Sequence, residues 1–125
     1  MTIEQINTTL KQCFECQKNG NVYKIDTGAT FINGKEIVLF IEQKNDKWYL
    51  SDNKITMKYM NDMYDLKSSD VKMCISNVLK IYAFSINSGI LNVEIPSLQT
   101  LPDKIFDMIM CIGQLANMFA FFDKP

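Results

Sequence analysis

The chain has 125 residues and a formal net charge of −1, and 47% of its residues are apolar. This length predicts one domain over residues 1–125 with a core of its own. All 13 basic residues are lysines and histidine is absent, which excludes histidine bases and the arginine contacts that commonly read phosphate and guanine. We therefore expect no direct nucleic-acid binding.

The first element expected is an N-terminal helix. Thr2 and Gln5 have the spacing of a capping box, and the apolar residues that follow have helical spacing up to about Lys18, where an Asn-Gly-Asn sequence ends the pattern. Cys13 and Cys16 form a C-x-x-C inside this pattern. Because no second pair follows, structural thiols are favoured over a zinc or redox site.

Residues 22–52 predict a β-meander of three strands. Asn33-Gly34 is the strongest short hairpin signal a sequence offers, and Asn45-Asp46 predicts a second turn. The apolar run at 37–41 lies between these turns and predicts the central strand. Thr27-Gly28 indicates a bend or bulge within the first strand.

Helices and a hairpin are predicted for the second half. A short helix follows residue 52, and Ser68 has the position of an N-cap for a helix ending near Tyr82. Residues 84–95 predict a hairpin around an Asn-Ser-Gly turn. The result is an α+β fold, in which an antiparallel five-stranded sheet (a three-strand meander plus a hairpin) is packed by N-terminal, middle and long C-terminal helices.

The C-terminal helix, expected from residue 101 to residue 122, has the most informative pattern. Its apolar residues recur at alternating intervals of four and three, the spacing of a buried helical seam. The seam residues are Leu101, Ile105, Met108, Ile112, Leu115, Phe119 and Phe122. Further apolar residues widen the seam beyond what one sheet would cover, so we expect burial against another molecule. The residues assigned to this partner or dimer interface are Met110, Gly113, Met118, Phe121 and Phe122.

Asp52 and Asn53, at the end of the meander, form a candidate functional turn. An aspartate at this position either contacts a partner or caps the following helix. Asp26, Glu42 and Asp52 also leave open an enzyme that uses carboxylates and a bound metal, which requires two of them to converge in one pocket. No motif for a cofactor or a metal occurs, and we expect neither.

Three segments resemble the uncharacterised family called domain of unknown function 1828. They are the extended Thr30-Phe31 segment, the apolar strand at 37–41 and the sequence Trp48-Tyr49-Leu50-Ser51-Asp52. The resemblance extends over about residues 23–117. The family often has Asp-Asp-Gly where this chain has Asp52-Asn53-Lys54. Its members are frequent in phage, prophage and other mobile elements, so the resemblance implies that setting and no particular reaction.

The order of elements is also similar to that of the small dimeric chaperones of specialised secretion systems, by analogy of topology alone. This similarity implies an alternative function, a dimeric holder of an extended client.

We expect a non-enzymatic protein-binding module that inhibits or modulates a host protein, with a defence component as one candidate, by stoichiometric binding as a homodimer. The N-terminus lacks the basic and apolar segments of a signal peptide. The C-terminal apolar run is shorter than the roughly 20 residues that span a bilayer. We therefore expect a cytoplasmic protein without membrane contact.

Overall fold

The computed structural model describes residues 1–11 and 13–118. The elements are α1 (Ile3–Leu10), β1 (Glu15–Asn19), β2 (Val22–Thr30), β3 (Glu36–Lys44), β4 (Lys47–Ser51), α2 (Ile55–Met63), α3 (Ser69–Tyr82), β5 (Ser85–Asn87), β6 (Ile90–Ile95), the short 3₁₀ helix η1 (Leu98–Thr100) and α4 (Leu101–Ala116). The chain is α+β, as expected. Within the described residues the strands form one antiparallel sheet of six strands in the order β1-β2-β3-β4-β6-β5, one strand more than predicted.

The extra strand is β1, which occupies part of the expected N-terminal helix. The helix begins as predicted, because Thr2 and Gln5 form both hydrogen bonds of a capping box. It ends at Leu10, however, where Lys11 adopts a left-handed conformation (φ 50°). The following residues pair with β2 instead, and Cys16 lies opposite Ile25 in the register. The prediction of a helix to about residue 18 was therefore wrong.

The rest of the meander is confirmed. Asn33 and Gly34 lie in the turn between β2 and β3, where Gly34 has a φ of 87°. Asn45 and Asp46 both have positive φ values in the tight turn between β3 and β4. The register between β2 and β3 shifts between Asp26 and Thr30, which places the expected irregularity at Thr27-Gly28.

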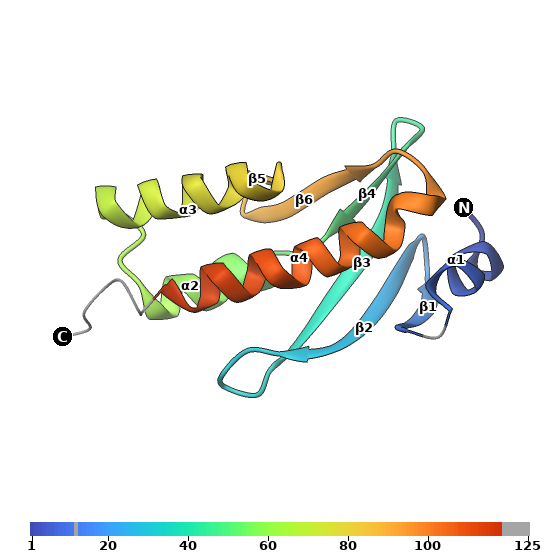
Figure 1. Ribbon diagram of the computed structural model, residues 1–125, viewed down its shortest axis with the longest axis horizontal. Helices are drawn as coiled ribbons and strands as arrows, with labels where there is room; N and C mark the ends of the chain where they lie inside the picture. Colours follow the sequence, from blue (N-terminus) through green and yellow to red (C-terminus); the bar gives the residue numbers. More distant parts are fainter. Residues whose placement is uncertain (12, 119–125) are drawn as a thin grey trace.

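The core lies between one face of the sheet and the helices. Figure 1 shows α4 crossing in front of the strands with α3 beside it, and α4 also contacts α1, α2 and β6. The sheet side chains that are fully buried are Ile25, Leu39, Ile41, Leu50 and Leu91. The fully buried seam residues of α4 are Leu101, Ile105, Met108, Ile112 and Leu115. The seam predicted for this helix is therefore confirmed as far as the structure describes it.

Helix α4 is shorter than expected. It ends at Ala116 rather than near residue 122, and the backbone N–H of Asn117 donates to the carbonyl of Gly113 at its end. The Tyr64 hydroxyl, just after α2, donates to the Ala116 carbonyl at 2.9 Å and joins the two helix ends. Phe119 and Phe122, the last two seam residues, lie outside the described residues.

Candidate functional site

The structure separates the residues assigned to the C-terminal interface. Met110 is 58% exposed and is available to a partner. Met118 is only 1% exposed and packs into the chain's own core, so its side chain is not open to a partner in this structure. Gly113 is partly exposed, and a Cβ atom built on it would meet no described atom within 4 Å. Phe121 and Phe122 lie outside the described residues.

Large apolar side chains remain exposed on the neighbouring helices α3 and α4. Met73 and Ile81 on α3, with Phe106 and Met110 on α4, have exposed fractions between 51% and 70%. We call these four residues the outer helix surface. The two helices are joined through their polar side chains as well, because the Gln114 amide donates to the Tyr82 hydroxyl at 2.9 Å. Half-exposed Phe106 also contacts the ring of Phe14 at a centroid distance of 5.1 Å.

Asp52 has a structural role in the turn after β4. Its side chain is 1% exposed. One carboxylate oxygen accepts from the backbone N–H groups of Lys54 and Leu91, and the other accepts from that of Thr56. These three bonds satisfy donors at the start of α2 and tie that helix to β6, which is the capping alternative described above.

Asn53 differs from its neighbour because it is exposed, with a left-handed backbone (φ 51°). Lys54 is also left-handed, with a φ of 72°. Asp52 and Asn53 therefore do not form one site. Asp52 is buried, and of the two only Asn53 is accessible to a ligand.

The cysteines divide into exposed and buried thiols. Cys13 is exposed in the connection after α1, whereas Cys16 faces the core from β1. Burial raises the pKa of Cys16 to about 11. Burial, with a smaller contribution from the charge of Asp52, raises the pKa of Cys111 to about 12. Thiols with raised pKa values hold their protons and react slowly. The two cysteines of the C-x-x-C therefore differ, because Cys16 is buried and Cys13 is exposed.

The sheet face opposite the helices carries a groove that sequence reasoning missed. One hollow of about 210 Å³ has Tyr49 and Ser51 of β4 in the middle. Its walls are Glu42 and Lys44 of β3 on one side, and Asn87, Ile90 and Asn92 of β5 and β6 on the other. A second hollow of about 130 Å³ adjoins it, shares Glu42 and Ser51, and adds Val22, Phe40 and Asn53. We call the two hollows together the sheet groove.

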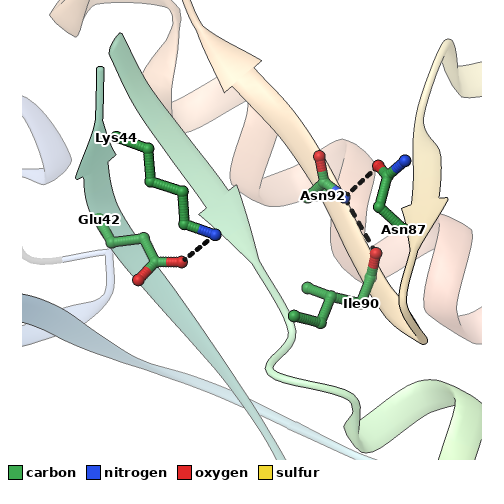
Figure 2. A network of polar contacts seen from close by, with 5 residues as sticks. All are labelled: Glu42, Lys44, Asn87, Ile90 and Asn92. Carbon is green, nitrogen blue, oxygen red and sulfur yellow. Dashed lines mark hydrogen bonds and ion pairs between the residues drawn. The ribbon is translucent and has the colours of Figure 1, made fainter. Parts of the chain in front are cut away.

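Figure 2 shows how the walls of the groove are organised. On the β3 side, the Lys44 ammonium lies 3.2 Å from a Glu42 carboxylate oxygen. On the opposite side, the Asn92 amide donates to the Asn87 side-chain oxygen at 2.9 Å and to the Ile90 carbonyl at 3.0 Å. Strand β4 passes between the two walls and forms the floor.

The three carboxylates considered for a metal-assisted enzyme are not brought together. Glu42 lines the sheet groove, Asp26 lines a different hollow beside β1, and Asp52 is buried. Among the described residues, no three histidine, cysteine or acidic side chains could hold a metal ion together. In the same part of the chain, no helix combines the length and apolar character needed to cross a bilayer.

Comparison with known proteins identifies a family without an assigned activity. No curated protein and no solved structure matches the chain. A family model described as "Domain of unknown function DUF1828" matches residues 27–114, which run from the bulge of β2 to the last turns of α4. This match spans most of the chain, and the protein therefore belongs to the DUF1828 family.

Proposed function

We propose that this protein is a non-enzymatic binding module that contacts another protein through the outer helix surface. The observation that carries the proposal is Met110, which is 58% exposed on a helix whose seam residues from Leu101 to Leu115 are buried in the core. Flexible methionine side chains are favoured at binding surfaces that adapt to a partner. Two partners are proposed. One is a host protein that the chain inhibits or modulates, in keeping with the mobile-element setting that the family resemblance implies. The second partner is another copy of the chain.

The apolar area supports an association of modest strength. Complete burial of a Met, Ile or Phe side chain contributes about 1.5–3 kcal/mol. More than half of each of the four side chains is still exposed, so each has roughly 1 kcal/mol or slightly more left to contribute. A symmetric dimer that covered all four residues would use each side chain twice, and the free energies would sum to about 8–12 kcal/mol before an association cost of at least about 4 kcal/mol. The remainder corresponds to dissociation constants in the micromolar to millimolar range.

Light scattering on the full chain over a wide dilution series tests the homodimer. We expect the weight-average mass to rise with concentration from 14.4 kDa towards twice that value. Met110→Lys should keep the chain monomeric at the same concentrations, because an ammonium in the interface would lose its water. Ile32→Lys is the matched control, since Ile32 is 68% exposed in the β2–β3 turn and belongs to neither α3 nor α4.

The same two variants test a host partner. A partner that binds the outer helix surface should lose affinity for Met110→Lys and keep it for Ile32→Lys. The proposal is overturned if wild type stays at 14.4 kDa throughout and every partner protein binds the two variants equally.

A further inference from the structure

The sheet groove contains polar groups that have no partner within the protein. Among the described residues, the Tyr49 and Ser51 hydroxyls make no hydrogen bond, although Ser51 is only 5% exposed. Asn92 uses its amide as a donor and leaves its side-chain oxygen unused, while Asn87 uses its oxygen and leaves its amide unused. Asn87 is exposed and Asn92 and Tyr49 are partly exposed, so water meets these groups in the free protein and a ligand that replaces this water has to offer matching donors and acceptors.

We propose that the sheet groove binds a short, uncharged, extended peptide segment. The unused Asn87 amide is a donor and the unused Asn92 oxygen is an acceptor, and the two residues lie next to each other on the same side of β4 (Figure 2). A peptide group offers the matching acceptor and donor. The Tyr49 and Ser51 hydroxyls on the floor can each serve as donor or acceptor for the next peptide group.

The charges in and beside the groove favour an occupant without net charge. Lys44 is paired with Glu42 at 3.2 Å, and Lys47 is paired with Glu94 at 3.7 Å. The charges of two lysines and two glutamates therefore sum to zero around Tyr49. A charged ligand would have to compete with these pairs, and an anionic nucleic acid would find no excess of basic groups.

The shape of the groove sets the length and the side chains of the peptide. Neighbouring strands lie about 4.8 Å apart, so the four intervals between Val22 on β2 and Asn87 on β5 measure roughly 19 Å across the sheet. Asn87 is opposite Ile90, four residues along β6 from the row that contains Val22 and Tyr49, so the diagonal path is roughly 23 Å. An extended chain advances about 3.3 Å per residue, and a hexapeptide of roughly 20 Å covers most of this path. The two hollows have apolar surfaces, Val22 and Phe40 in one and Tyr49 and Ile90 in the other. Each accommodates one small apolar side chain.

Nuclear magnetic resonance titration of the full chain tests this inference directly. The probe is a hexapeptide of alternating valine and serine, blocked at both ends so that it carries no charge. We expect it to shift the side-chain amide signals of Asn87 and Asn92 saturably, while the Asn77 signal on α3 stays constant. A hexapeptide with lysine in place of valine should bind more weakly.

Asn87→Asp is the decisive variant, because its carboxylate still accepts the bond from the Asn92 amide and only the unused donor is lost. We expect it to weaken peptide binding about tenfold, the effect of one lost hydrogen bond. Asn77→Asp makes the same charge change on exposed α3 and should bind as wild type. Tyr49→Phe removes one floor hydroxyl and should weaken binding by a smaller factor.

Three results would overturn the inference. The first is no shift of the Asn87 and Asn92 side-chain signals up to the solubility limit of the peptide. The second is equal affinity of Asn87→Asp and Asn77→Asp. The third is a shift of the groove signals when the protein alone is concentrated, which would assign this face to a second copy of the chain. None of these readouts depends on the outer helix surface, which Met110→Lys tests separately.

Discussion

Removing the Asp52 carboxylate should be among the most damaging changes in this chain. The side chain is buried at the junction of β4, α2 and β6, and three backbone N–H groups donate to it at 3.0–3.1 Å. In Asp52→Ala, the N–H groups of Thr56 and Leu91 lose their acceptor in the protein interior, whereas that of exposed Lys54 can turn to water.

The magnitude follows from these bonds. Leaving a buried donor unsatisfied costs about 1–3 kcal/mol, and two such donors give about 2–6 kcal/mol. The free energy of unfolding of a small domain is about 5–15 kcal/mol in total, so Asp52→Ala removes a large share of the stability. Asp52→Asn should cost less, because an amide oxygen still accepts from two donors and only the third bond is lost.

Urea unfolding followed by circular dichroism measures both variants. We expect a lower midpoint with an unchanged m-value, since the folded state stays compact. The control is Asp62→Ala on the exposed face of α2, which should change the free energy of unfolding by no more than about 0.5 kcal/mol. A loss below about 1 kcal/mol in Asp52→Ala would refute the structural role derived from these bonds and return Asp52 to the list of ligand-binding candidates.

Other changes test the helix, the turn and the thiols. Gly113→Ala should stabilise the monomer by about 0.5–1 kcal/mol in urea unfolding, because its Cβ meets open space; weaker self-association in the same variant would place another chain there. Lys54→Gly should stabilise the fold by up to about 1 kcal/mol by relieving the left-handed backbone. Because the pKa values of Cys16 and Cys111 rise from 9.0 to about 11 and about 12, the folded chain retains protons that the unfolded chain releases above pH 9. The free energy of unfolding should therefore fall by about 1.4 kcal/mol per pH unit for each thiol, from pH 9 up to about pH 11 for Cys16 and about pH 12 for Cys111. The fall should be less steep in Cys111→Ala. Cys13, which is exposed, should be alkylated much faster than either buried thiol.

Turns could be predicted from the sequence because their chemistry is local. Gly34 and the Asn45-Asp46 pair adopt positive φ values that these residue types tolerate. The same dipeptide signal exists at Asn19-Gly20, where it was interpreted as the end of a helix. Residues 15–19 are polar and have little strand propensity of their own, so only their pairing with β2 makes them a strand.

The sheet groove could not be predicted in this way, because it depends on register between segments far apart in sequence. Phe40, Ser51 and Asn92 come from three strands and lie in one row only through the pairings of β3 with β4 and of β4 with β6. Alternation within each strand shows that two faces exist. It does not show which residues of different strands become neighbours, nor that a concave surface forms between them.

The C-terminal helix shows both the value and the limit of a hydrophobic pattern. A helix that is apolar around most of its circumference must be buried on several sides, and α4 fulfils that condition within one chain because α1, α2, α3 and β6 all contact it. Cys111 is therefore inside, as is Met118 just after the helix, although a single covering sheet would have left part of the helix bare. What the chain's own helices leave uncovered on α4 is the side that carries Phe106 and Met110. Within the described residues, a partner at this helix would therefore bind through these two side chains, because the rest of the apolar surface of α4 is already covered by the chain itself.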